Sequence, residues 1–348
     1  MAQPAIKLVA IPGGSGTIGS SIVRALLGHP RYRPIILSRA TAEKPANTSS
    51  SVEYITPEST PTRYSSLETR YVDYTSVSSL QTALTGVYAV ISALLVTDGQ
   101  TVRYHLNLLA ASVAAKVSRF APSEFALSQS AHGEVTIDYD KIVIWKSVRE
   151  AVEKGDIDAA AFPCGMFMNY LAVGLNQSEE DMNDPFFQSA PPLAGFREGP
   201  LMFHLAGPEP YVEVPLTLDG KFPQLSMTDI RDVGRFVVAA LDMEEPWGGR
   251  ELGMVGETAD MKDIVAIIEN VLAKKVDARG ATRQQLQQRL ESMDQDDFLG
   301  RINVEYTMVC GKGGSIVEGT LNRLCPQVLP TKIRGFLEGV VKKGLTSE

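Results

Sequence analysis

The sequence predicts an α/β protein built on a doubly wound parallel sheet, with a smaller C-terminal lobe. Two observations predict this fold class. Short apolar runs alternate with amphipathic segments from the N-terminus onward, as they do in repeated strand–helix–strand units. The first apolar run, 8–11, also leads directly into a glycine-dense turn and then an apolar-periodic segment, which is the context of a dinucleotide-binding fingerprint.

The glycine turn, GGSGTIG at 13–19, follows the first strand. Its glycines fit two spacings, GxGxxG from Gly14 and GxxGxxG from Gly13, and both spacings share Gly16 and Gly19. In either case the glycines allow a tight turn, a close approach to a pyrophosphate and close packing of helix on strand. The following helix would then present its free N–H groups to the phosphates, although a glycine turn without a ligand is the alternative. The expected cofactor contacts are Gly13, Ser15, Gly16, Thr17, Ile18 and Gly19.

The second strand, 34–39, ends where this fold places the adenosine ribose. An acidic residue there binds the 2′-hydroxyl of NAD, whereas an arginine accommodates the 2′-phosphate of NADP. Ser38 and Arg39 occupy this position, Lys44 follows, and no acid comes before Glu43. Because a guanidinium binds phosphate bidentately, the sequence favours NADP; a solvated basic loop is the alternative.

The alternation then continues without a break, so the sheet is expected to be parallel. Residues 40–66 are rich in Ser, Thr and Pro and are expected to form an exposed loop. Strands are expected at 70–74, 88–94, 119–123 and 158–162, and helices at 76–84, 101–115, 229–242, 262–273 and 281–293. Residues after strand ends line the crevice in such sheets, which adds Asp73, Ala93, Leu94, Ser123, Glu124, Pro163 and Gly165 as cofactor contacts. The alternative for Glu124 is a charge at a helix N-terminus or a partner in a salt bridge.

Aromatic and sulfur-containing side chains gather after the strand at 158–162. They suit an apolar, aromatic-type substrate, and core packing is the alternative. The expected substrate contacts are Phe125, Trp145, Met166, Phe167, Met168 and Tyr170. The Pro-rich stretch 176–220 is expected to be irregular and to belong to the substrate lobe. The expected domains are 1–160 plus about 225–260 for the cofactor, and about 161–224 plus 261–348 for the substrate.

Composition excludes several classes of protein. The 348 residues carry a net charge of −8, which argues against a nucleic-acid binder. No apolar run is long enough to span a bilayer, and the first residues lack the pattern of a signal peptide. Cys164, Cys310 and Cys325 show no CxxC spacing, so neither a disulfide framework nor a metal site is expected, and the cytoplasm is the expected location. The histidines show no triad spacing; His29 and His105 are interpreted as structural, whereas His132 and His204 could face a pocket.

Several motifs together resemble the NmrA-like and isoflavone-reductase-like group of atypical short-chain dehydrogenases. They are the glycine turn, VDY at 72–74, RFAPSEFAL at 119–127, GMFMNYL at 165–171 and MTDIRDVGRFVVAALD at 227–242. The resemblance reaches to about residue 257. It implies an NADP-binding fold and, for many members, reduction of an aromatic or conjugated small molecule. Some members instead bind NADP as redox-sensing regulators without turnover.

Reductases of this group carry a lysine on the helix after the fifth strand. Counted from the flanking landmarks, that position falls on Trp145 here, so this chain departs from the pattern. Lys141 lies one helical turn earlier on the same face, whereas Lys146 points about 100° away. Lys141 is therefore the preferred proton donor and a further cofactor contact, with an ordinary surface lysine as the alternative, and Lys146 is the second candidate.

The expected function is NADPH-dependent reduction of a small apolar or aromatic metabolite, in specialised metabolism. Two alternatives stay open: an NADP-binding redox sensor without turnover, and a cyclisation or isomerisation with no net redox change. The expected partner is a small-molecule substrate, with no nucleic acid and no membrane, and a homodimer is left open.

Overall fold

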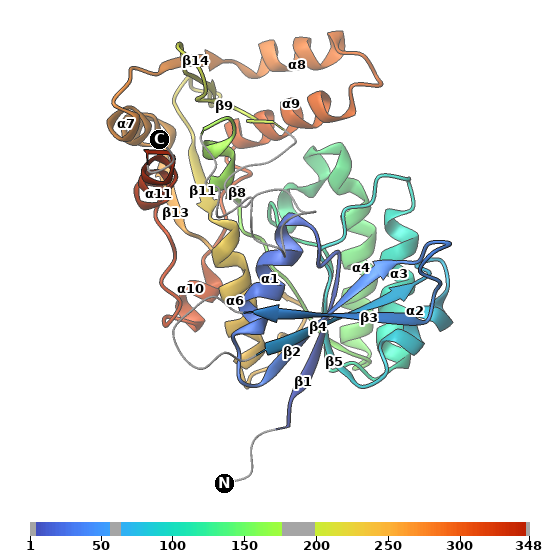
Figure 1. Cartoon of the computed structure of the whole chain (residues 1–348). Helices are drawn as coiled ribbons and strands as arrows, with labels where there is room; N and C mark the ends of the chain where they lie inside the picture. The colour runs from blue at the N-terminus through green and yellow to red at the C-terminus, as the bar shows by residue number, and fades with distance from the viewer. Residues whose placement is uncertain (1–4, 56–63, 176–198, 346–348) are drawn as a thin grey trace. The chain divides into compact units, whose positions relative to one another are not determined.

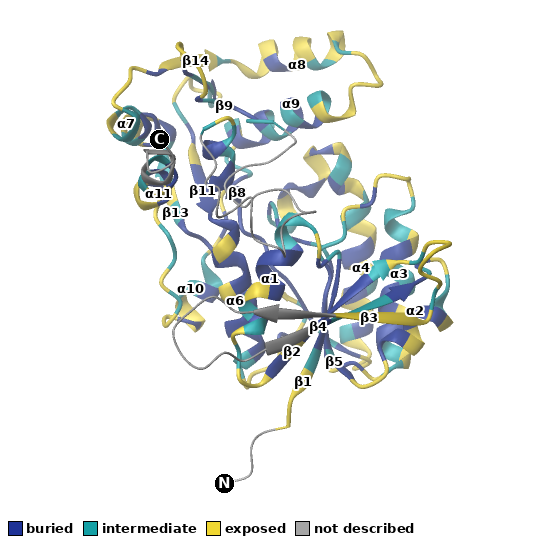
Figure 2. Ribbon diagram, viewed as in Figure 1, coloured by how far each residue is buried: buried dark blue, intermediate teal, exposed yellow. Residues whose placement is uncertain are grey.

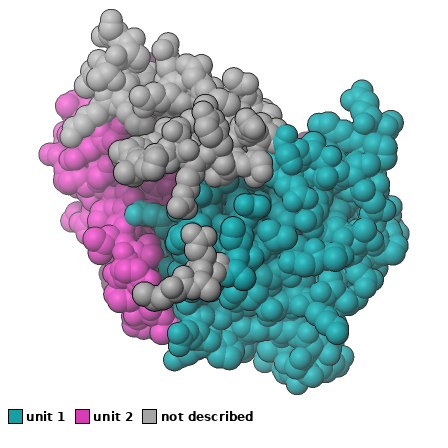
Figure 3. All heavy atoms as spheres, turned by 60° about the horizontal axis from the view of Figure 1, so that its bottom comes forward, with its two compact units in different colours: residues 1–125, 140–162, 234–252 teal, residues 126–139, 163–233, 253–348 magenta. Residues whose placement is uncertain are grey.

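The computed structural model describes residues 5–55, 64–175 and 199–345 (Figure 1). The chain divides into two compact units, which Figure 3 colours separately. Unit 1 consists of Met1–Phe125, Asp140–Phe162 and Gly234–Leu252, and unit 2 of Ala126–Tyr139, Pro163–Val233 and Gly253–Glu348. Each unit is therefore assembled from separate parts of the chain.

Unit 1 contains an eight-stranded sheet among its described residues, in the order β12-β7-β6-β5-β1-β2-β4-β3. The strands are β1 Lys7–Pro12, β2 Tyr32–Arg39, β3 Thr48–Ile55, β4 Tyr64–Val72, β5 Val87–Ile91, β6 Arg119–Ala121, β7 Asp158–Ala161 and β12 Arg250–Glu251. Every neighbouring pair is parallel except β3 with β4. The chain adds strands on both sides of β1, so the sheet is doubly wound, as the sequence predicts.

Helices cover both faces of this sheet because its central strands carry apolar residues that are buried on both faces. Val9, Ala10 and Ile11 of β1 are completely buried. The helices are α1 Thr17–Leu27, α2 Val77–Ala83, α3 Thr101–Ala114, α4 Tyr139–Glu153 and α6 Ile230–Asp242. Helices α2, α3 and α4 pack into one apolar core with the strands, and α1 lies on the other face (Figures 1 and 2).

One edge of the sheet differs from the prediction. Residues 40–66, expected to form an exposed loop, contain β3 and the start of β4, which pair as an antiparallel hairpin. The sequence of β3, TSSSVEYI, has polar residues where a half-buried strand would alternate, so its periodicity did not mark it. Polar composition of this kind is typical of an edge strand. An edge strand has unpaired backbone groups, and polar side chains disfavour their pairing with a strand of another chain.

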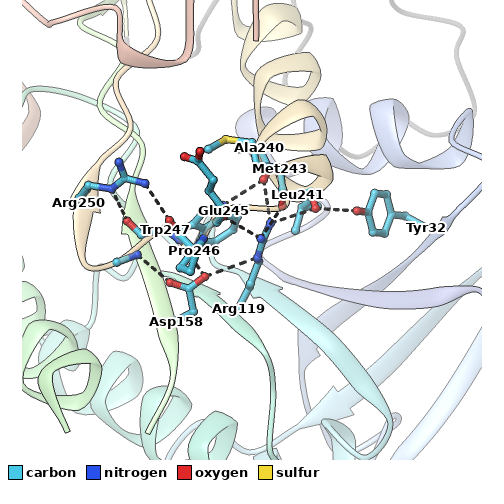
Figure 4. A network of polar contacts seen from close by, with 11 residues as sticks. Tyr32, Arg119, Asp158, Ala240, Leu241, Met243, Glu245, Pro246, Trp247 and Arg250 are labelled. Atoms are coloured by element: carbon cyan, nitrogen blue, oxygen red, sulfur yellow. Dashed lines mark hydrogen bonds and ion pairs between the residues drawn. The ribbon is translucent and has the colours of Figure 1, made fainter. Parts of the chain in front are cut away.

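The amino ends of the strands hold a buried arginine (Figure 4). Arg119, the first residue of β6, is 7% exposed. Its guanidinium donates hydrogen bonds to the carbonyls of Ala240 and Leu241, at 2.9 and 3.0 Å, and to those of Met243 and Glu245, at 2.6 and 3.2 Å. These carbonyls lie at the end of α6 and just beyond it, where a helix leaves its last carbonyls without partners.

The same network includes an acid and a tryptophan. The Nε atom of Arg119 lies 3.6 Å from a carboxylate oxygen of Asp158, and the guanidinium carbon lies 5.1 Å from the centre of the Trp247 ring. Asp158 in turn accepts hydrogen bonds from the backbone N–H groups of Trp247 and Gly248, at 2.9 and 2.8 Å. The charge of Arg119 is therefore neutralised and its donors are bonded inside unit 1.

Unit 2 has two three-stranded sheets among its described residues, β14-β10-β9 and β13-β11-β8. The strands are β8 Met166–Phe167, β9 Phe203–His204, β10 Tyr211–Pro215, β11 Gln224–Thr228, β13 Glu257–Asp260 and β14 Asp277–Ala281. The helices are α7 Met261–Leu272, α8 Arg283–Ser292, α9 Phe298–Gly311, α10 Thr320–Leu324 and α11 Ile333–Leu345, and short 3₁₀ turns occupy Gln129–Glu134, Thr136–Asp138 and Met168–Ala172. Of the stretch expected to be irregular, 176–198 lies outside the described residues, and the remainder contains β9 and β10.

Unit 2 has an apolar core of its own. Phe203, Met227, Ile264 and Phe336 bury at least 99% of their surface in it. In the described part of the chain, none of the helices combines the length and the apolar character needed to cross a membrane.

Candidate functional site

The cofactor contacts expected in unit 1 lie mainly where neighbouring parallel strands end. They are Gly13–Gly19 after β1, Ser38 and Arg39 at the end of β2, Asp73 after β4, Ala93 and Leu94 after β5, and Ser123 and Glu124 after β6. Because parallel strands end at the same side of a sheet, the fold brings these segments together, and we call this place the carboxyl end of the sheet. The strand order changes direction here, between β1 and β5, which is where doubly wound sheets bind ligands.

The glycine turn is packed too tightly for larger residues. Gly13 has a φ of +76°, and a Cβ atom on it would lie 2.5 Å from the carbonyl oxygen of Ala93. A Cβ atom on Gly19 would overlap the carbonyl oxygen of Gly13. The left-handed residue is thus Gly13, which is the first glycine of the GxxGxxG spacing. A Cβ atom on Gly14 would still meet the Ile36 side chain at 2.9 Å, so both spacings describe glycines that the fold needs.

Helix α1 begins with donors that no capping side chain can satisfy. Its N-cap is Gly16, which has no side-chain oxygen, and the Gly16 carbonyl accepts a hydrogen bond of 2.8 Å from Ser20 N. The N–H groups of Thr17, Ile18 and Gly19 are the first three of the helix, and its positive dipole end lies beside them. Backbone donors at a glycine-lined helix start fit the pyrophosphate of a dinucleotide.

Two cations and a carboxylate lie at the ends of β2 and β4. The side chain of Arg39 is 62% exposed, and its nearest ion-pair oxygen, on Asp98, is 3.6 Å away. Lys44 belongs to a turn closed by the bond from Thr41 N to its carbonyl, at 2.9 Å. Asp73 accepts hydrogen bonds from the hydroxyl and the backbone N–H of Thr75, which lower the pKa of its carboxyl. Asp73 is therefore an ionised acceptor directly after β4, and the cation whose charge lowers its pKa further is Arg103.

Helix α4 separates the two candidate lysines. Lys141 is half-buried and Lys146 is exposed, whereas Trp145 is 8% exposed and belongs to the core of unit 1. Burial lowers the pKa of His105, and the charge of nearby Lys141 lowers it further. His105 Nε2 in turn lies 3.5 Å from the hydroxyl of Ser92, the residue that follows β5. Lys141 is thus the lysine near the carboxyl end of the sheet, and its role as proton donor stays a prediction.

The contacts expected from unit 2 form a turn with a fixed backbone. The N–H groups of Cys164 and Gly165 both donate to the carbonyl of Ala126, at 2.9 Å. Gly165 has a φ of +68°, and a Cβ atom on it would overlap the carbonyl oxygen of Ser226. The carbonyl of Pro163 accepts a bond of 2.9 Å from Met254 N. The cofactor contact predicted for Pro163 and Gly165 stays a prediction.

The side chains expected to contact a substrate are mostly core residues of their own units. Met166 and Met168 lie in the core of unit 2, and Phe125 of unit 1 is 4% exposed and stacks on Phe162. Phe167 is 8% exposed, and Tyr170 is half-buried. Sequence alone does not separate the lining of a pocket from the packing of a core, so their substrate role stays a prediction.

The remaining polar candidates have structural surroundings. His29 bonds to Asp242 at 3.1 Å, His132 is completely buried, and His204 stacks on Tyr211 with ring centres 4.3 Å apart. Within the described residues, no three or more His, Cys, Asp or Glu residues are grouped so that they could hold a metal ion. All three cysteines are buried, and burial raises the pKa of the Cys310 thiol to about 12.

Comparison with known sequences gives a family match along most of the chain. Residues 5–308 match the model of the NmrA-like family. The chain belongs to the NmrA-like family. Among family relatives, oxidoreductase BOA1 of Botryotinia fuckeliana is 27% identical over 276 residues, which cover 77% of this chain and 76% of the relative. Oxidoreductase swnN of Metarhizium robertsii is 31% identical over 121 residues, covering 34% of this chain and 30% of the relative.

Solved structures share the fold of this NmrA-like chain at low sequence identity. AtPrR2 with NADP+ and (+)pinoresinol has a TM-score of 0.66 at 17% identity, covering 98% of this chain and 100% of that one. Isoflavone reductase has a TM-score of 0.64 at 18% identity, covering 96% and 99%. The ternary complex of leucoanthocyanidin reductase from Vitis vinifera has a TM-score of 0.62 at 14% identity, also covering 96% and 99%. The family resemblance and the fold predicted from the sequence are confirmed.

Two residues at the carboxyl end of this NmrA-like sheet were missed by sequence reasoning. Asp98 and Tyr104 lie after β5 and on α3, and they contact each other and Arg39. No motif marks them, because an acid in a loop and a tyrosine on a helix are common. An inspection of charges around the predicted phosphate contact would have been the only signal.

Proposed function

We propose that this NmrA-like chain is an NADP(H)-dependent oxidoreductase that reduces a small, apolar or aromatic molecule. The observation that carries the proposal is the carboxyl end of the unit 1 sheet, where a close-packed glycine turn leads into α1 and Arg39 ends β2. Relatives named oxidoreductases, and fold neighbours solved with NADP+ or NADPH, support it.

Different residues of the carboxyl end would bind different parts of the cofactor. The N–H groups of Thr17, Ile18 and Gly19 would hold the pyrophosphate, because they are donors at a positive helix end. Arg39 and Lys44 would hold the 2′-phosphate, which needs cations in its reach. The bound cofactor supplies a hydride at its nicotinamide ring.

Lys141 is the proposed proton donor. A substrate that accepts a hydride develops negative charge, and an ammonium group placed beside it gives a proton more effectively than bulk water. Lys141 is half-buried near Ser92 and His105, whose imidazole is kept neutral by burial and by the neighbouring lysine. His105 therefore adds no positive charge of its own beside Lys141 at neutral pH.

Cofactor binding and turnover test the proposal in two steps. Fluorescence titration of the wild-type chain with NADPH and NADH should give a dissociation constant at least about tenfold lower for NADPH, since only NADPH carries the phosphate that Arg39 can bind. Stopped-flow absorbance with a panel of quinones, enones and aromatic carbonyl compounds should then show oxidation of the bound NADPH.

Each negative result has its own meaning. A chain that binds neither nucleotide contradicts the proposal. A chain that binds NADPH tightly but oxidises it with no member of the panel favours the redox sensor without turnover.

The two lysines of α4 form a matched pair of variants. Lys141→Ala should keep NADPH binding and lose about 10²- to 10⁴-fold in the rate of turnover, which is the usual cost of one positioned general acid. Lys146→Ala removes the same charge from the exposed side of the same helix and should change the rate less than about threefold. Pre-steady-state rates with a substrate found in the panel decide between them; the opposite ranking transfers the role to Lys146.

A further inference from the structure

A carboxylate is held against the proposed phosphate-binding arginine. Asp98 lies in the loop between β5 and α3, and its side chain is 38% exposed. One carboxylate oxygen accepts a hydrogen bond of 3.1 Å from Gln100 N. The other accepts a hydrogen bond of 3.1 Å from the Tyr104 hydroxyl and lies 3.6 Å from the guanidinium of Arg39. Asp98 is thus held in place by Tyr104 of α3 and faces Arg39 at the end of β2.

The tyrosine that fixes Asp98 is itself rigid. Tyr104 is 9% exposed and packs in the core of unit 1, with its ring centre 5.8 Å from that of Tyr74. Burial and the hydrogen bond to Asp98 raise the pKa of the Tyr104 phenol, so its hydroxyl is a donor at neutral pH. The guanidinium carbon of Arg39 lies 5.8 Å from the centre of the same ring. Tyr104, a buried residue of α3, therefore positions Asp98 and also provides the aromatic ring beside the Arg39 guanidinium.

Asp73, a second acid at the carboxyl end, is committed elsewhere. Asp73 accepts both of its short hydrogen bonds from Thr75, at 2.7 and 2.8 Å, and is not an ion-pair partner of Arg39 in the described residues. An anion that binds Arg39 must therefore either displace Asp98 from the guanidinium or share the guanidinium with it. A dianionic phosphate can do this because it forms two charge-assisted hydrogen bonds, but it does so against the nearby negative charge.

We propose that Asp98, positioned by Tyr104, is the counter-charge that limits how strongly Arg39 favours a 2′-phosphate, and so sets the degree of selectivity between NADP and NAD. The inference rests on the proposed function. Asp98 acts through Arg39 and is a positioning residue. It weakens the binding of any nucleotide that carries the phosphate and leaves a nucleotide without it unaffected, because only the phosphate competes for the guanidinium.

The variant Asp98→Asn removes the charge and keeps the shape of the side chain. Isothermal titration with NADP+, with 2′,5′-ADP and with NAD+ should show the first two binding about two- to fivefold more tightly than to the wild type, the range expected for one exposed ion pair. The affinity for NAD+ should stay the same. The gain should shrink as salt is raised from about 20 mM to about 500 mM, because exposed charges are screened.

A charge-matched control distinguishes a local effect from a change in net charge. Glu153→Gln removes one negative charge from the exposed end of α4, where the acid pairs with Arg149 at 3.6 Å. It should leave all three affinities unchanged. In the background of Arg39→Ala, Asp98→Asn should change the affinity for NADP+ by less than about twofold, because no guanidinium remains to be released.

Several outcomes overturn the inference. Equal or weaker binding of NADP+ by Asp98→Asn, while the wild type binds it, contradicts the counter-charge role and leaves the proposed function standing. A gain that persists undiminished without Arg39 assigns the effect to direct repulsion of the phosphate. A wild-type chain that binds no nucleotide removes both this inference and the proposed function.

Discussion

The two ends of the unit 1 sheet each hold an arginine, and the surroundings of the two side chains are opposite. Arg119, at the amino end, is 7% exposed and is bonded to several carbonyls and to an acid (Figure 4). The side chain of Arg39, at the carboxyl end, is 62% exposed, and among the described residues it pairs with Asp98 at 3.6 Å. A buried charge requires partners for folding, whereas an exposed charge beside unsatisfied donors is available to a ligand.

The helix ends next to these arginines repeat the contrast. The last carbonyls of α6 are satisfied from within the protein by Arg119 and by the indole N–H of Trp247, which donates to the Ala240 carbonyl at 3.0 Å. The first N–H groups of α1 face a glycine N-cap that cannot accept their bonds. Both ends leave backbone groups of a helix unpaired, and within residues 5–55, 64–175 and 199–345 only those at the amino end are bonded by side chains.

The largest effect is expected at the amino end. Arg119→Ala should lower the free energy of unfolding of unit 1 by about 3–5 kcal/mol, because it removes the guanidinium donors of the buried Ala240 and Leu241 carbonyls and the ion-pair partner of Asp158. Urea denaturation followed by circular dichroism measures the loss. Arg119→Lys should lose less, since an ammonium keeps the charge but not the fork of donors. A loss below about 1 kcal/mol would show that water replaces the guanidinium.

At the carboxyl end the same kind of substitution should affect binding and not folding. Arg39→Ala should weaken the binding of NADP+ by about tenfold to a hundredfold, the range for a lost charge-assisted hydrogen bond, and change the free energy of unfolding by less than about 0.5 kcal/mol. Titration with NADP+ and urea denaturation measure the two quantities. Arg33→Ala, an exposed arginine near the start of the same strand, is the matched control. If both variants lose the same affinity, Arg39 is not the discriminating residue.

Acid should act on the carboxyl end through His105. Burial lowers the pKa of this imidazole below its usual value of 6.5, so folding favours the neutral ring. The contribution of the neutral His105 ring to the free energy of unfolding is fully present above pH 6.5. It is lost as the pH falls through the lowered pKa of the folded state. Urea midpoints measured from pH 8 to pH 5 should therefore fall, and His105→Gln should flatten that fall. An equal fall in both chains would assign the acid sensitivity to other groups.

The smallest effect is expected for an arginine that belongs to neither end. Arg149 on α4 is exposed and pairs with Glu153 one helical turn later, at 3.6 Å. Arg149→Ala should cost about 0.5 kcal/mol or less of the free energy of unfolding and leave NADP+ binding unchanged. Thermal denaturation and the same titration set this baseline. A larger effect on binding would mean that net charge, and not position, controls affinity.

The sequence predicts the carboxyl end better than it predicts the amino end. Apolar runs and the glycine turn mark β1 and α1 because strand burial and the GxxGxxG spacing are local properties of the chain. The role of Arg119 depends on carbonyls more than a hundred residues later, and the ion pair of Arg39 depends on a loop after another strand. Contacts of this kind leave no periodic signal. The hairpin of β3 was missed for a different reason, since its polar edge sequence resembles a loop.

The network around Arg119 also affects the order in which unit 1 can fold during synthesis. Its acceptors lie at Ala240, Leu241, Met243 and Glu245, while the strands that it anchors are complete by Ala161. During synthesis the growing sheet therefore exposes an arginine that lacks its carbonyl acceptors, together with the unpaired edge of β7, until the segment with α6 and β12 leaves the ribosome. Unit 1 reaches its native state only after much of unit 2 has been made, so a chain truncated before residue 252 should aggregate even though its nucleotide-binding motif is intact.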